Sequence, residues 1–174
     1  MKGAKWMCFI VAALSLAIVG CDKKDEAADT RTNFTDSSFA VLASMINAGE
    51  VAVSQVVADS SDDPAVVDFA EMMIADHTAA QQELLSVTGQ VGLGTSNTID
   101  QDHQQLISSL LTLKGTALDS LYMISQVAAH EKSIDIYKNH GGHGLYRYLK
   151  FYTNELLPVL TTHLQQARTL SQKY

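Results

Sequence analysis

The stretch that decides the fold is residues 115–137, GTALDSLYMISQVAAHEKSIDIY. Its apolar residues recur at the three-and-four spacing of an amphipathic helix. The stripe predicted to face the core runs through Asp119, Met123, Val127 or Gln126, His130, Ile134 and Tyr137. A carboxylate and an imidazole therefore interrupt a face that should be apolar. Asp119 and His130 lie about three turns apart, so one small ligand cannot touch both.

The same anomaly recurs in the other segments with helical spacing. The spacing and the capping residues predict helices over residues 36 or 37 to 59–61, 63 to 88, 96 or 98 to 139, and 145 to 170. The first stripe includes Ile46 and Glu50, the second His77, and the fourth His163. A carboxylate buried alone is costly, so Glu50 is expected to have a cation, a proton or a hydrogen-bond partner.

Glycine and proline mark the breaks between these helices. Residues 89–97 are rich in glycine and predict the longest internal loop. This loop is either a crossover connection along the bundle or an ordinary turn that is longer than it needs to be. Gly115 is expected at most to kink the third helix, and Pro158 to bend the fourth. The segment 139–144, NHGGHG, predicts a closing loop on which His140 and His143 are exposed and solvated rather than bound to a metal.

The amino terminus has the order of a secretory signal. Lys2 and Lys5 precede an apolar run over residues 6–19, which is shorter than the ~20 residues that span a bilayer. The last residues before Cys21 resemble the lipobox of bacterial lipoproteins, which implies lipidation of Cys21 after removal of residues 1–20; the alternative is an uncleaved anchor. Residues 21–33 then form the lipidated cysteine and a flexible tether, and residues 34–174 one domain. A lipid-anchored, periplasm-facing position in the cell envelope is expected. Asp22 resembles the inner-membrane retention signal of enteric lipoproteins, which favours the inner membrane where that rule applies.

Charge and cysteine content narrow the class of function. Removal of residues 1–20 takes the formal net charge from −7 to about −9, which argues against nucleic acid as a partner. Cys8 would leave with the signal and Cys21 would carry lipid, so thiol chemistry and thiolate metal sites are excluded. Membrane attachment through lipid and an envelope protein partner remain open.

Four long helices predict an all-α, antiparallel four-helix bundle. Counting residues from the turns brings four ionisable groups to a similar height if the third helix begins near residues 102–104: Glu50, His77, Asp119 and His163. Two carboxylates and two imidazoles are ligand chemistry for iron, manganese or zinc. Asp76 and Tyr122 are expected to orient an imidazole, and His130 to lie about three turns above the ligands. The alternative is a metal-free network that fixes the helix register.

The chain resembles a family of bacterial envelope proteins of unknown function within the ferritin-like superfamily. The residues that carry the resemblance are Phe39 with Glu50, Phe69-Ala70 to Asp76-His77, Leu118-Asp119 with Tyr122 and His130, and Leu157-Pro158 with His163. The resemblance implies a ferritin-like bundle and no established activity. Di-iron members carry two Glu-x-x-His pairs, whereas Ile74 and Leu160 precede His77 and His163 by three residues here. Binding of one metal ion, or of an envelope partner, is therefore expected rather than catalysis.

Overall fold

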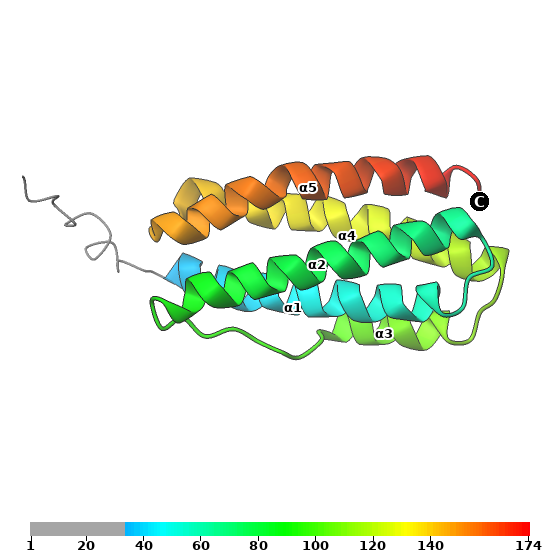
Figure 1. The fold of residues 1–174 in the computed structure, drawn as a ribbon, viewed down its shortest axis with the longest axis horizontal. Helices are drawn as coiled ribbons and strands as arrows, with labels where there is room; N and C mark the ends of the chain where they lie inside the picture. Colours follow the sequence, from blue (N-terminus) through cyan, green and yellow to red (C-terminus); the bar gives the residue numbers. More distant parts are fainter. Residues whose placement is uncertain (1–33) are drawn as a thin grey trace, which may run out of the picture.

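The structure, a computed structural model, describes residues 34–174. The predicted signal sequence, Cys21 and the tether lie outside the described residues. All of the regular structure in residues 34–174 is helical: α1 (Phe34–Ala58), α2 (Pro64–Gly89), α3 (Gln101–Leu110), α4 (Thr116–His143) and α5 (Arg147–Ser171). The all-α prediction is confirmed, and four of the five helices run nearly the full length of the molecule (Figure 1).

The four long helices pack side by side in a ring, in the order α1, α2, α5, α4. Each helix runs antiparallel to its two neighbours in this ring (Figure 1). The chain passes from the end of α2 back along the bundle through an extended segment and α3, which lies against α1, before α4 begins. The glycine-rich segment is therefore a crossover, and it leaves α2 and α4 parallel.

The structure corrects the prediction of one continuous third helix. α3 ends at Leu110 and α4 begins at Thr116 in the opposite direction. Gly115 lies in this reversal with a φ of 55°, a conformation that glycine adopts without steric cost. The turn thus reverses the chain instead of kinking a helix, and it sets the position of every residue in α4.

Helix starts follow local sequence chemistry where capping side chains are present. The carboxylate of Asp63 accepts a hydrogen bond from the Ala65 amide at 2.8 Å, and Pro64 occupies the first position of α2. Asp100 caps α3 by accepting from the His103 amide at 2.9 Å. Pro158 lies within α5, as the sequence shows.

The bundle core consists of two apolar clusters. One lies toward the turn between α1 and α2 and includes Val57, Val66, Phe69 and Leu118; the other lies toward the opposite end and includes Phe39, Leu84, Tyr146 and Leu149. Apolar burial at about 25 cal/mol per Å² stabilises both ends. Buried polar residues, including Glu50, His77, His130 and His163, occupy the middle of the helices that these clusters hold together.

Within residues 34–174, one helix is long and apolar enough to cross a membrane by length and composition, over Thr35–Ala58. Half of its most apolar window is buried against the rest of the bundle. Helices in the core of a bundle meet the same criterion, so this segment is explained by its packing.

Candidate metal centre

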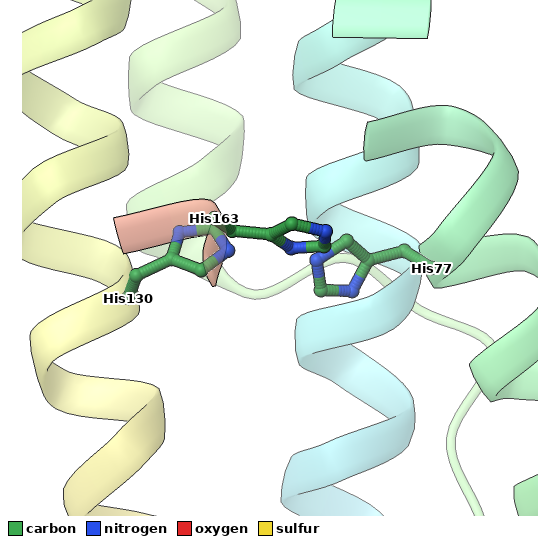
Figure 2. Close-up of side chains that lie close together, drawn as sticks. All are labelled: His77, His130 and His163. Carbon is green, nitrogen blue, oxygen red and sulfur yellow. The ribbon is translucent and has the colours of Figure 1, made fainter. Parts of the chain in front are cut away.

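Three histidines from three helices meet in the middle of the bundle. His77 of α2, His130 of α4 and His163 of α5 are 1–3% exposed and point toward one another (Figure 2). Their ring centroids are 5.9 Å (His77 to His130), 5.8 Å (His77 to His163) and 5.3 Å (His130 to His163) apart. His77 and His130 lie on parallel helices at nearly the same distance from the helix starts, which places them at one level.

Each ring has one nitrogen fixed by a hydrogen bond. His130 Nδ1 donates to the carbonyl oxygen of Gln126 at 2.9 Å, and His163 Nε2 donates to the Asp76 carboxylate at 2.9 Å. A backbone carbonyl and a carboxylate both act as hydrogen-bond acceptors, so the tautomer of these two rings is set.

The tautomer of His77 is set through Asn47. The Asn47 amide nitrogen donates to Gln81 Oε1 at 3.3 Å and to the Tyr152 hydroxyl at 3.2 Å, which turns its oxygen toward His77. His77 Nδ1 therefore donates to Asn47 Oδ1 at 3.0 Å. All three imidazoles carry their proton on the outward-facing nitrogen.

The inward-facing nitrogens are His77 Nε2, His130 Nε2 and His163 Nδ1, and these three atoms are buried without a hydrogen-bond partner. Each therefore presents a lone pair, and the three ligand atoms lie within 4.8 Å of one another. Buried acceptors without partners are rare because their desolvation costs about 1–3 kcal/mol each. Three such acceptors that face a common point form a group that could hold a metal ion.

The separation of these nitrogens is compatible with one ion. Zinc–imidazole bonds are about 2.0–2.1 Å long, so an ion at the centre would draw each ring inward by less than about 1 Å. Hydrogen bonds from the outward nitrogens to a carboxylate, an amide and a backbone carbonyl are the arrangement that orients metal-binding histidines. The donor set fits a first-row transition metal that favours imidazole nitrogen.

Glu50 of α1 supplies a negative charge beside the histidines. It is 1% exposed, and its Oε2 accepts a hydrogen bond from Gln126 Nε2 at 2.7 Å. Burial by itself would raise the pKa of Glu50, but His103, the imidazoles of His130 and His77, and the Gln126 amide together lower it to about 2. The carboxylate is therefore ionised at neutral pH. The side-chain oxygen of Gln126, Oε1, is buried without a hydrogen-bond partner.

Burial disfavours the charged form of two histidines of the centre, His77 and His163. Burial lowers the pKa of His77 to about 4, despite the opposing charge of Glu50. Burial also lowers the pKa of His163, against the opposing effect of its hydrogen bond to Asp76. A buried anion beside imidazole nitrogens that have no hydrogen-bond partner is an arrangement that a cation stabilises.

Most of the residues predicted for this centre are in the bundle core, but not all of them meet. His77 and His163 lie together, and His130, which was expected three turns away, completes the group of three. Glu50 lies beside this group, where its charge interacts with His130 and His77. Asp76, predicted to orient an imidazole, accepts a hydrogen bond from His163 Nε2. Among the described residues, the group with metal-binding geometry is His77, His130 and His163.

Asp119 lies elsewhere, which corrects its place in the predicted ligand set. It is in the first turn of α4 and accepts a hydrogen bond from Ser61 Oγ at 2.6 Å, next to the turn between α1 and α2. The reason is the chain reversal before Thr116, which starts α4 at the end of the bundle. Tyr122, expected to orient an imidazole, instead pairs its hydroxyl with that of Ser54 at 2.9 Å and packs in the apolar cluster near the same end.

The prediction that His140 lies exposed on a loop is also corrected. α4 continues to His143, and His140 is 2% exposed instead of lying on an exposed loop. Its Nε2 is 2.9 Å from Asp36 Oδ1 and its Nδ1 is 2.8 Å from Thr153 Oγ1. Gly144 allows this packing, because a Cβ there would clash with His140 and Asp36. His143 is exposed, as predicted.

Asn47 and His103 are functional candidates that the sequence pattern did not single out. The predicted stripe of α1 passed through Ile46, but Asn47 is the buried residue, 1% exposed. Asn47 lies three residues before Glu50 and four after Ala43, so the helical spacing does contain it. His103 lies on α3, which the prediction had merged with α4.

Comparisons with known proteins agree with an all-helical domain. The sequence profile described as "Domain of unknown function (DUF4142)" matches residues 21–170. The fold is similar to that of the crystal structure of a DUF305 fragment from Deinococcus radiodurans, with a TM-score of 0.73 and 9% sequence identity over 82% of this chain and 99% of that fragment. At this identity the similarity concerns the fold alone. A search of curated proteins found no match. Because the profile spans most of its length, the chain belongs to the DUF4142 family.

Proposed function

We propose that this protein binds one first-row transition-metal ion in the middle of its bundle, through His77 Nε2, His130 Nε2 and His163 Nδ1. Glu50 supplies the compensating negative charge, and one of its carboxylate oxygens is the fourth ligand. The observation that carries the proposal is the set of three buried imidazole nitrogens that face one another without partners. Iron, manganese and zinc all accept a site of imidazoles and a carboxylate, and the absence of thiolate ligands disfavours Cu(I).

The proposal concerns one ion and a binding role. Both Glu-x-x-His pairs of di-iron proteins are absent, since Ile74 and Leu160 precede His77 and His163 by three residues, and the described residues contain one group of three metal-binding side chains. A ferritin-like relationship is part of the proposal: it is supported by the long crossover between α2 and α4, since ferritin-like bundles have one such connection. We further propose that Cys21 carries lipid and that residues 22–33 tether the bundle at the periplasmic face of a membrane.

The test is metal analysis of the full chain, purified in detergent without chelator and without a histidine tag. Elemental analysis is expected to give about one iron, manganese or zinc ion per chain. His77→Ala and His130→Ala should abolish stoichiometric binding while helix content, measured by circular dichroism, is kept. His143→Ala is the matched control, because His143 lies on the same helix as His130 but is exposed, and it should bind like the wild type.

A metal-free wild type that gains no thermal stability from Fe²⁺, Mn²⁺ or Zn²⁺ would refute the metal proposal. The second candidate would then apply, a structural bundle that binds an envelope partner. His103 favours that candidate: burial tends to lower its pKa, but Glu50 and Asp100 outweigh burial and raise it, so a protonated His103 can neutralise Glu50 without a metal. In that case Glu50→Gln should change stability and leave metal content unaffected.

A further inference from the structure

A cavity of about 270 Å³ connects the buried Glu50 with the surface between α1, α3 and α4. Its outer lining includes Asp102 and Lys132, whose side chains are 80% and 72% exposed, and its inner lining includes Glu50, which is buried. Ala129 and His103 also line the cavity. The cavity therefore leads from solvent to the carboxylate that stands beside the three histidines.

The opposite side of the histidine group is closed by comparison. There a cavity of about 10 Å³ is lined by His77 and His163 of the centre and by Val159 of α5. That volume holds about one water molecule. A hydrated cation has room to approach through the larger cavity and not through the smaller one.

The larger cavity has the charge that attracts a cation. Its lining contains Glu50, Asp100 and Asp102 against one lysine, and Lys132 is itself held by Asp102 at 3.4 Å. A concave surface of one sign raises the local concentration of counter-ions and their rate of association. Acidic residues alone would not make a binding site, but behind Glu50 lie four buried atoms without partners, three imidazole nitrogens and Gln126 Oε1.

His103 stands at the inner end of the cavity with one nitrogen turned toward Glu50. Its Nδ1 lies 2.8 Å from Asp100 Oδ2, and its Nε2 lies 4.0 Å from Glu50 Oε1. In the neutral ring with its proton on Nδ1, the Nε2 lone pair faces the cavity. Two ligand atoms 4.0 Å apart can both reach an ion with bonds of about 2.0–2.2 Å. Gly49 makes this position possible, because a Cβ at residue 49 would overlap the ring of His103.

We infer that this cavity is the port through which a divalent cation reaches the three-histidine centre, and that His103 and Glu50 form the first binding station on the way. The inference deepens the proposed function and rests on it. Glu50 then has two roles: it takes the ion from His103 with one oxygen and holds it beside His77, His130 and His163 afterwards. The crossover places α3 against α1, and α3 thereby brings His103 next to Glu50.

Loading of the metal-free full chain with Co²⁺, followed by stopped-flow absorbance, tests the port. Ala129→Phe narrows the cavity without touching the histidines. It should lower both the loading rate and the rate of Co²⁺ release to a chelator at least 10-fold, and leave the stoichiometry unchanged. Val159→Phe is the matched control beside the small cavity and should load at the wild-type rate. Circular dichroism checks that both variants fold.

A second variant addresses the station itself. His103→Gln should slow loading several-fold and weaken its dependence on salt, while one Co²⁺ per chain is still bound at equilibrium. Wild-type rates in both Ala129→Phe and His103→Gln, or equal slowing in Val159→Phe, would overturn the port. Failure of the wild type to bind any Co²⁺ would instead refute the proposed metal centre, so the two failures are distinguishable.

Discussion

The chain buries histidines in two regions to almost the same extent, and they differ in their hydrogen bonds. His140, near one end of the bundle, has a partner at both ring nitrogens, Asp36 and Thr153. His77, His130 and His163, in the middle, each have a partner at one nitrogen and none at the other. Burial alone would not have separated them, since all four are 1–3% exposed.

The difference indicates two uses of the same residue type. His140 and Asp36 join the start of α1 to the turn before α5, where Asp36 also accepts hydrogen bonds from the amides of Leu145 and Tyr146. This arrangement has the features of a structural contact. In the three-histidine group, the lone pairs of three nitrogens instead face a common enclosed point. These nitrogens do not stabilise the fold until a ligand or ion occupies that point.

The largest test of this comparison is the stability of the metal-free protein. His140→Leu should lower the free energy of unfolding by about 3 kcal/mol, because the buried Asp36 carboxylate loses the hydrogen bond from the imidazole. His130→Leu should change it by less than about 1 kcal/mol, because it removes a buried acceptor that has no partner together with one hydrogen bond to a helix carbonyl. Urea unfolding with chelator present measures both. Equal losses in the two variants would contradict the distinction.

Acidification is the second test, and its direction follows from His77. The pKa of His77 is about 4 in the folded chain, against an ordinary value of 6.5. Below pH 6.5 the unfolded chain binds a proton that the folded chain does not, so the free energy of unfolding falls with pH, by up to about 3 kcal/mol near pH 4. The lowered pKa values of His140 and His163 act in the same direction, and the raised pKa of His103 opposes them.

The measurement is urea unfolding of the metal-free chain from pH 7.5 to 4.5, in the wild type and in His77→Leu. The variant should lose less stability over this range, and His143→Leu should behave like the wild type because His143 is exposed. A wild type whose stability is flat or rises on acidification would show that His77 is protonated in the folded state. The metal proposal would then lose one of its neutral ligands.

Much of this comparison could be predicted from the sequence, because helical spacing is a local property. The spacing put Glu50, His77, His130 and His163 on buried faces, and all four are buried. Asp63-Pro64 marked the start of α2, and the structure confirms it. These features depend on residues within one or two turns of one another.

The errors came from features that are not local. Leu106, Leu110 and Leu113 continue the spacing toward Leu118, so the pattern does not reveal the reversal at Gly115. That reversal sets the height of α4, and with it the exchange of Asp119 for His130 in the centre. His140 precedes two glycines that suggest a loop, whereas contacts with Asp36 and Thr153, distant in sequence, accompany the helix through them.

The smallest expected effect concerns Asp76, the carboxylate that holds His163. Its side chain is 46% exposed, so Asp76→Ala should leave the stability of the metal-free protein nearly unchanged. The same substitution frees His163 Nε2 and loosens the ring and its tautomer, which should weaken metal affinity about 10- to 100-fold. Asp68→Ala is the matched control, because Asp68 is an exposed carboxylate on the same helix. Competition of a colorimetric chelator for Zn²⁺ measures both affinities. Equal affinities would mean that His163 is not a metal ligand. His163 would then have a structural role, as His140 has, although one of its ring nitrogens has no hydrogen-bond partner.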